Sequence, residues 1–325
     1  MRVLITGGAG FVGSHLVDAH LAKGDEVVVV DDLSTGRLEN IGEHVAAGRV
    51  HFLQGKAEDP DIIDPAFDGV GLVYHLAAAV GVFQILAHPL ASIRTNLDAS
   101  SAVFERAAAR GIRTLFASTS EVYGKNVSDA LNEDDDTIYG ATKVNRWLYA
   151  VSKATDEFLA LGYYQELGLP VTVVRLFNTT GPRQTGAYGM VVPRFVRQAI
   201  EGRPLTVYGD GGQLRCFTNV HDVVAALMAL TATPASVGEV VNVGNPREIS
   251  IGDLAALVCG IVGSDSNVQL VDYESAYGKG FEDMRRRVPD VSRLRKLIGF
   301  VPTTPLEDTI REIAAEIAAE IAPGR

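Results

Sequence analysis

The chain of 325 residues has 47% hydrophobic and 21% charged residues and a mean hydropathy of +0.13, a balance typical of a compact globular protein. This composition excludes an intrinsically disordered chain and a coiled coil. At roughly 150 residues per domain, the length predicts one large domain or two closely associated ones. Forty acidic against 29 basic residues give a net charge of −11, the wrong sign for a surface that binds nucleic-acid phosphates.

The cysteine count and the hydrophobic runs narrow the class further. Cys216 and Cys259 are too few for a disulfide framework or a cysteine-based zinc site, which indicates a reducing compartment and no metal. The N-terminus carries only Arg2 before a short apolar run, and no later segment offers about 18 consecutive apolar residues. We therefore expect a cytoplasmic protein without a membrane segment.

Short β-branched runs alternate with longer helical patterns in the first half of the chain. The predicted strands are 2–6, 26–32, 49–55, 71–77, 114–119 and 171–177, and the predicted helices are 15–23, 92–110 and 146–167. For the helix 146–167 we expect a core face of Leu148, Val151, Phe158 and Leu161. This alternation predicts an α/β fold with a Rossmann-type, doubly wound parallel sheet.

After Phe177 the sequence becomes rich in glycine and proline, over 178–189 and 202–215. Helices are predicted at 192–201, 221–231 and 312–322, and a strand at 239–244. We expect the strand 239–244 and the preceding helix 221–231 to belong to the first sheet and its covering helices. We therefore predict two interleaved domains, one of residues 1–177 with a return segment at about 217–244, and a smaller one of residues 178–216 and 245–325.

Three glycines, Gly7, Gly10 and Gly13, follow the first strand and open the first helix. A tight turn, close approach of a pyrophosphate and the free N–H groups of a helix N-terminus favour glycine in this context, so the loop predicts a dinucleotide site. Asp31 ends the second strand, where a carboxylate would bind the ribose 2′-hydroxyl and repel a 2′-phosphate. This position favours NAD over NADP, while Arg37 in the next loop keeps NADP open.

Two Tyr-x-x-x-Lys pairs occur, Tyr139 with Lys143 and Tyr149 with Lys153. Residues four apart share a helix face, so the lysine ammonium can lower the tyrosine pKa and allow the tyrosinate to accept an alcohol proton. We choose the second pair because it lies inside a clear amphipathic helix. Thr119 and Glu121 end the fifth predicted strand, at the sheet edge where α/β proteins bind ligands.

These residues together resemble the extended short-chain dehydrogenase/reductase family that modifies nucleotide sugars. The resemblance extends over nearly the whole chain and is carried by TGGAGFVGSHL (6–16), HLAA (75–78), STSEVYG (118–124), YAVSK (149–153), RLFNTTGPR (175–183), PLTVYGDGGQLRCF (204–217) and RRRVPD (285–290). It implies tightly bound NAD, oxidation of the sugar at C4 and a 4-keto intermediate. It also implies a homodimer formed through the helices near 92–110 and 146–167.

The resemblance implies a role for each residue that matches a family motif. NAD would contact Gly7, Gly10, Phe11, Val12, Gly13, Asp31, Asp32, Leu76, Ala77, Ala78, Tyr149 and Lys153. The catalytic residues would be Thr119, Glu121, Tyr149 and Lys153. The nucleotide sugar would contact Ser120, Asn178, Arg183, Tyr208, Arg215 and Arg287, with Arg215 and Arg287 as a clamp on its diphosphate.

Within the family, Thr119-Ser120-Glu121 is similar to the UDP-glucuronate decarboxylases, and this is the expected activity. The alternatives are a 4-epimerase of a UDP-hexose or of UDP-glucuronate and, less favoured, a 4,6-dehydratase. A non-enzymatic NAD sensor is disfavoured because Thr119, Tyr149 and Lys153 are all present. Gln84, in the segment 78–86 that would border the sugar, is a candidate determinant of specificity.

Overall fold

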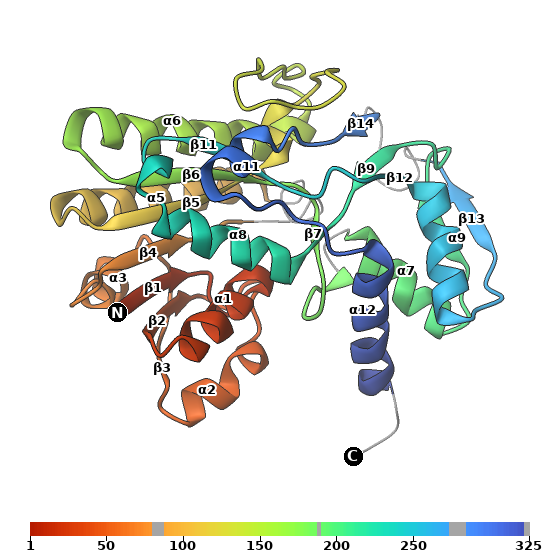
Figure 1. Ribbon diagram of the computed structural model, residues 1–325, viewed down its shortest axis with the longest axis horizontal. Helices are drawn as coiled ribbons and strands as arrows, with labels where there is room; N and C mark the ends of the chain where they lie inside the picture. Colours follow the sequence, from red (N-terminus) through yellow and green to blue (C-terminus); the bar gives the residue numbers. More distant parts are fainter. Residues whose placement is uncertain (80–87, 187–189, 273–283, 322–325) are drawn as a thin grey trace.

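The computed structural model describes residues 1–79, 88–186, 190–272 and 284–321 (Figure 1). In this part of the chain the largest sheet has seven strands in the order β11-β6-β5-β4-β1-β2-β3, all parallel. The strands are β1 (Arg2–Thr6), β2 (Glu26–Asp31), β3 (Val50–Gln54), β4 (Leu72–His75), β5 (Arg113–Thr119), β6 (Val171–Leu176) and β11 (Val240–Val243). The strand order reverses between β1 and β4, as in a doubly wound sheet, and the predicted fold class is confirmed.

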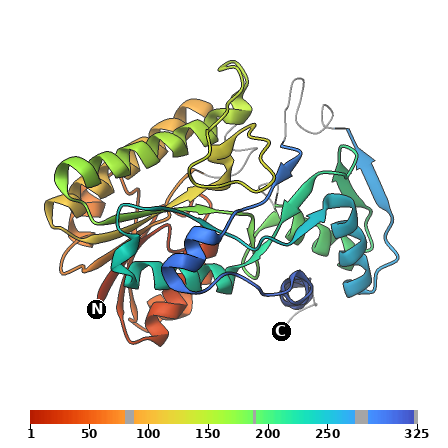
Figure 2. The same ribbon diagram turned by 45° about the horizontal axis from the view of Figure 1, so that its top comes forward.

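Helices cover both faces of this sheet (Figures 1 and 2). On one face lie α1 (Phe11–Ala22), α8 (Val220–Ala232) and α11 (Ser292–Ile298), and on the other lie α3 (Pro60–Ala66), α5 (Pro89–Ala109) and α6 (Leu148–Leu167). Successive strand residues point to opposite faces, so Val3 and Ile5 belong to one core and Leu4 to the other. Burial on both faces explains why the strands read as continuous apolar runs.

The later part of the chain builds a smaller layer beside the sheet, to the right of it in Figure 2. Helices α7 (Val191–Ile200), α9 (Ile251–Val262) and α12 (Leu306–Ile321) share a third core there. Short sheets pair β8 (Leu205–Tyr208) with β13 (Val268–Val271), β9 (Leu214–Cys216) with β12 (Glu248–Ser250) and β14 (Arg286–Arg287), and β7 (Thr179–Thr180) with β10 (Thr218–Asn219). The remaining short helices are η1 (Leu38–Asn40), α2 (Gly42–Ala46), η2 (Ser120–Tyr123), η3 (Asn145–Trp147) and η5 (Pro234–Ser236).

Several predicted elements begin earlier in the structure than in the sequence analysis. Helix α1 begins at Phe11, directly after the glycine loop, because the extended Gly10 forms its N-cap. Helix α12 begins at Leu306, since its buried stripe includes Leu306 and Ile310 as well as Ile313 and Ile317. Strand β11 pairs with β6 at the edge of the main sheet. The division into two domains stays a prediction.

The predicted core face of α6 is wrong for two of its four residues. Val151 is 43% exposed and Phe158 is 79% exposed, whereas Leu148 and Leu161 are half-buried. The side of α6 that packs on α5 and β5 carries small and polar residues instead: Ala150, Lys153, Ala154, Asp156, Glu157 and Ala160. The apolar stripe of this helix therefore faces outward in a single chain.

A buried ion pair connects α6 to the sheet. The Arg175 guanidinium donates to both carboxylate oxygens of Glu157 at 2.8–3.2 Å, and the Ser118 hydroxyl donates to the same carboxylate. Both partners of the ion pair are almost inaccessible to solvent. Removal of one partner would leave a buried charge without its counter-ion, which is strongly destabilising.

We predict that Arg175→Ala lowers the free energy of unfolding by about 3–5 kcal/mol, measured by urea denaturation. The matched control is Arg311→Ala, which removes an exposed ion pair with Asp308 at 2.6 Å. Exposed pairs of this kind contribute about 0–1 kcal/mol. Equal losses in the two variants would contradict the assignment of Arg175 as a stabilising buried cation.

Candidate functional site

A cavity of about 780 Å³ opens beyond the carboxyl ends of the sheet strands, between the main sheet and the smaller layer. Its size and position are typical of ligand sites in α/β proteins. All but one of the predicted site residues line it: Gly7, Gly10, Phe11, Val12, Gly13, Asp31, Asp32, Leu76, Ala77, Ala78, Thr119, Ser120, Glu121, Tyr149, Asn178, Arg183, Tyr208, Arg215 and Arg287. The exception is Lys153.

The glycine loop between β1 and α1 has no room for side chains. Gly7 has a φ of +74°, and a Cβ there would lie 2.8 Å from the backbone nitrogen of Ala77. A Cβ on Gly13 would overlap the carbonyl oxygen of Gly7. The loop therefore packs against the end of β4, and the N-terminus of α1 opens directly into the cavity, an arrangement suited to a phosphate.

Asp31 joins the end of β2 to the glycine loop. One carboxylate oxygen accepts the N–H of Ala9 and the other accepts the N–H of Leu33, each at 2.9 Å. Burial raises the pKa of Asp31, and the two backbone N–H groups oppose that shift. A carboxylate has about four acceptor positions, so Asp31 can still accept hydroxyl groups of a ligand in the cavity.

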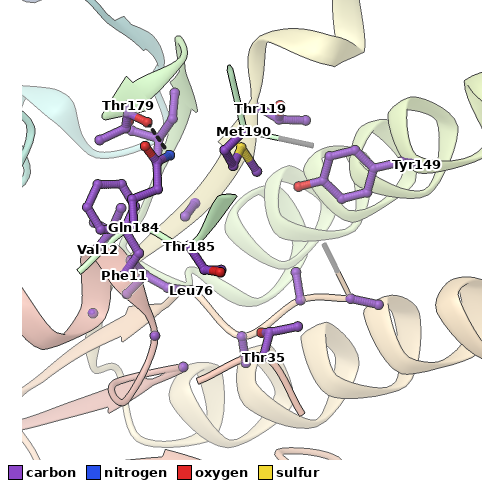
Figure 3. Close-up of a pocket in the computed structure, with 18 of the residues that line it drawn as sticks. Phe11, Val12, Thr35, Leu76, Thr119, Tyr149, Thr179, Gln184, Thr185 and Met190 are labelled. Atoms are coloured by element: carbon purple, nitrogen blue, oxygen red, sulfur yellow. Dashed lines mark hydrogen bonds between the residues drawn. The ribbon is translucent and has the colours of Figure 1, made fainter. Parts of the chain in front are cut away.

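Tyr149 and Thr119 approach the cavity from α6 and from the end of β5. Figure 3 shows the Tyr149 hydroxyl pointing into the cavity, on the same side as Thr119 and Met190. The Thr119 hydroxyl accepts the N–H of Glu121 at 3.2 Å, so its own hydrogen can be donated elsewhere. Burial, and then the charges of Glu121 and Asp156, raise the pKa of Tyr149. Its ionisation therefore needs a cation nearby.

Lys153 is not among the residues that line the cavity. Its side chain is 2% exposed, with the ammonium nitrogen 3.7 Å from an oxygen of Asp156 and 4.0 Å from the centre of the Phe116 ring. The competing pair, Tyr139 and Lys143, lies outside any regular helix, and neither of its residues lines the cavity. Of these four residues Tyr149 alone lines the cavity, and the choice of Tyr149 and Lys153 stays a prediction.

Two arginines from distant parts of the chain hold Glu121. Arg146 donates to one carboxylate oxygen at 2.6 Å, and Arg287 of β14 donates to the other. Burial alone would raise the pKa of Glu121, but Arg287 and Arg146 hold it well below its usual range. The group is therefore ionised at neutral pH and cannot act as a general acid in this state.

The same arginine connects Glu121 to the predicted diphosphate contacts. Arg287 also donates to the side-chain oxygen of Asn178 at 2.6 Å, and it is the register partner of Arg215 on the neighbouring strand β9. Arg183 lines the cavity too, although its guanidinium contacts Asp18 at 2.7 Å. This end of the cavity is cationic within a protein of net charge −11.

Several cavity residues were not predicted to form part of the site. Arg146 had no assigned role, because its partner Glu121 lies 25 positions away. Arg194 stacks 4.4 Å from the centre of the Tyr208 ring, and Gln184 donates to the carbonyl of Thr179 at 2.8 Å (Figure 3). Gln84 lies outside the described residues.

Within the described ranges, no cluster of three or more His, Cys, Asp or Glu residues could hold a metal ion. Both cysteines are free thiols. No helix in this part of the chain combines the length and the apolar character needed to cross a bilayer.

Comparisons with known proteins agree with this geometry. Residues 3–244 match the NAD dependent epimerase/dehydratase family. The chain is 39% identical to a UDP-N-acetyl-alpha-D-glucosaminuronate decarboxylase of Bacillus cytotoxicus, over 96% of each chain, and 36% identical to UDP-glucuronic acid decarboxylase 1 of Xenopus tropicalis, over 96% of this chain and 70% of the relative.

A similar solved structure is the UDP-glucuronic acid 4-epimerase of Bacillus cereus in complex with UDP-glucuronic acid and NAD. It has a TM-score of 0.87 and 28% identity, with 98% of this chain and 100% of that chain covered. The glycine loop, the tyrosine at the cavity and these matches lead to one conclusion: the chain belongs to the NAD-dependent epimerase/dehydratase family of extended short-chain dehydrogenase/reductase enzymes.

Proposed function

We propose that this enzyme decarboxylates a UDP-linked uronic acid, with UDP-glucuronate as its substrate. The observation that carries the proposal is the group formed by Glu121, Arg146 and Arg287 in the cavity that Tyr149 and Thr119 also line. Two guanidinium groups suit a sugar that carries a carboxylate at C5. The names of both relatives cited above specify decarboxylases of such sugars.

The residues that line the cavity fit NAD. The glycine loop leaves space for a pyrophosphate at the N-terminus of α1, and Asp31 can accept ribose hydroxyls. When bound, NAD supplies the hydride acceptor for oxidation at C4. Leu76, Ala77 and Ala78 would contribute apolar surface beside it.

In the proposed reaction, ionised Tyr149 accepts the proton of the C4 hydroxyl, with the Thr119 hydroxyl as a bridge between them. The resulting ketone lies β to the C5 carboxylate. The bond between C5 and the carboxyl carbon then breaks, carbon dioxide leaves, and the electron pair passes to the ketone oxygen as an enolate. C5 then takes a proton from water. Reduction of the ketone at C4 would give UDP-xylose, and without that reduction the product would be the 4-keto pentose.

Arg146 and Arg287 would hold the substrate carboxylate before its loss, and Arg215 would bind the diphosphate. The family resemblance assigns Arg287 to the diphosphate together with Arg215, and we propose the carboxylate for Arg287 instead because it pairs with Glu121. Because Glu121 is ionised between the two arginines, we propose that it orders the water that protonates C5 rather than donating a proton itself. Asn178 would fix the orientation of Arg287 through their hydrogen bond of 2.6 Å.

A 4-epimerase is the second candidate, favoured by the similarity to the solved UDP-glucuronic acid 4-epimerase. An epimerase would keep the C5 carboxylate and return the hydride to the opposite face of the ketone. Product analysis separates the two. The purified enzyme is incubated with UDP-glucuronate, UDP-N-acetylglucosaminuronate and UDP-glucose, and the products are identified by mass spectrometry and NMR.

We predict loss of carbon dioxide from UDP-glucuronate and formation of a UDP-pentose. Tyr149→Phe should lower this turnover by about 10²–10⁴-fold, since it removes the proton acceptor. Glu121→Ser should strongly impair decarboxylation. The same substitution would have a much smaller effect on an epimerase, because epimerisation at C4 needs no protein group at C5. A product of unchanged mass with inverted C4 would contradict the decarboxylase.

We predict that Asp31→Asn weakens NAD binding at least about tenfold, because a charged acceptor contributes roughly 1.5–3 kcal/mol to such a hydrogen bond. The variant should also narrow the preference for NAD over NADP, since the repulsion of the 2′-phosphate is lost. Calorimetric titration with both cofactors measures each change. Equal affinity of the unmodified enzyme for NAD and NADP would contradict this role.

A cytoplasmic location stays a prediction. We propose further that two copies of the chain associate through α5 and α6. The outward face of α6 carries Val151 and Phe158, which lie two helical turns apart and are 43% and 79% exposed. Large apolar side chains gathered on one helix face indicate a surface that another protein covers. Helix α5 packs directly against α6, so the two helices can form one contact surface.

Phe158→Asp should convert the dimer to a monomer in light scattering, because a charge placed in an apolar interface is left without a partner. The control is Glu166→Gln, an exposed change on the same helix. A monomeric unmodified enzyme, or a dimer that survives Phe158→Asp, would rule out this interface.

A further inference from the structure

Asp156 forms a buried pair with Lys153 that the proposed reaction does not use. Asp156 is fully buried, and one of its carboxylate oxygens lies 3.7 Å from the Lys153 ammonium nitrogen. The two residues are three positions apart on α6, so they lie on the same side of the helix. Lys153 lies one helical turn from Tyr149 along α6, and Asp156 lies about two turns from it.

The other acidic residue near Lys153 is Glu157, which already has hydrogen-bond partners of its own. The carboxylate of Glu157 accepts hydrogen bonds from Arg175 and Ser118. In contrast, both carboxylate oxygens of Asp156 are buried, and the groups that favour its ionised form are the Lys153 ammonium and the Ser100 hydroxyl. A buried carboxylate in this position is costly unless a cation lies beside it, and Lys153 is the cation that does.

The remaining neighbours of the pair come from the adjacent strands and from α5. Phe116 of β5 places its ring under the ammonium at 4.0 Å, a favourable cation–π contact. His75 of β4 is fully buried between Thr6 and Ser100 of α5, and burial followed by the charge of Lys153 lowers its pKa to about 3, so it adds no second cation.

The charge states of the two groups depend on each other. Burial lowers the pKa of Lys153, while Asp156 and then Glu157 oppose that shift. Burial raises the pKa of Asp156 to about 6, and Lys153 opposes that shift. Asp156 also raises the pKa of Tyr149, so by itself it hinders the tyrosinate. Asp156 can therefore assist the ionisation of Tyr149 only through its effect on the charge and position of Lys153.

We infer that Asp156 is a positioning residue: it is the counter-ion that keeps the Lys153 ammonium charged and in place, four residues from Tyr149 on α6. A charged lysine there is what stabilises the tyrosinate during oxidation at C4. The inference rests on the C4 oxidation step of the proposed function and is independent of whether decarboxylation or epimerisation follows.

A double-mutant cycle tests the pair without any substrate. The unfolding of the NAD-saturated enzyme is compared for Asp156→Asn, Lys153→Met and the double variant. Asp156→Asn alone should reduce the folding equilibrium constant at least about tenfold, whereas the same change in the Lys153→Met background should cost little or be stabilising. Equal losses in both backgrounds would overturn the inference. Glu166→Gln serves as the matched control on the same helix.

The pH dependence of C4 oxidation gives a second readout that a merely structural role would not move. NADH formation is followed with whichever nucleotide sugar the enzyme oxidises. In Asp156→Asn the alkaline limb, where Lys153 loses its proton, should move to lower pH by about one unit, a tenfold change in proton concentration. Asp156→Glu should restore it at least in part.

An alkaline limb that stays in place, or a shift of the acid limb alone, would overturn the role of Asp156 as counter-ion. If no nucleotide sugar is oxidised, the proposed function fails, and the unfolding cycle still decides whether Asp156 and Lys153 are coupled.

Discussion

The site depends on one buried ionic group, in which Arg146 and Arg287 hold Glu121. Arg146 lies in η3 directly before α6, Arg287 lies in β14, and Glu121 lies in η2 directly after β5, so the contact joins three parts of the chain around the cavity. Breaking such a group by removal of one member leaves uncompensated buried charge. The arrangement therefore connects β14 to the residues that follow β5, and it places positive charge in the cavity that a uronic acid would meet.

The charge of the protein is distributed unevenly, with positive side chains gathered around the cavity that holds Glu121, Arg146 and Arg287. The protein as a whole carries −11, yet Arg146, Arg183, Arg194, Arg215 and Arg287 all line one cavity. A diphosphate sugar with an additional carboxylate needs several cations at once. A net negative charge repels other polyanions such as nucleic acids, and the expectation that they do not bind this protein stays a prediction.

Much of the fold could be predicted from the sequence because its signals are local. The glycine loop, the β-branched strands and Asp31 each follow from residues a few positions apart. The Arg146–Glu121–Arg287 group could not be predicted, since its members are 25 and 166 positions apart. The outward face of α6 was misassigned because hydrophobic periodicity marks a buried face without saying whether the same chain or a second copy buries it. The position of Lys153 outside the cavity lining depends on Asp156 and Phe116, which no spacing rule connects to a cofactor site.

The most direct test of the central claim is a crystal structure of Tyr149→Phe with NAD and UDP-glucuronate bound. This variant keeps the site intact and stops the reaction before the sugar is oxidised. We predict that the C5 carboxylate contacts Arg287 and Arg146, with C4 facing position 149 and Thr119. A carboxylate directed away from both arginines, with Glu121 still held between them, would contradict it.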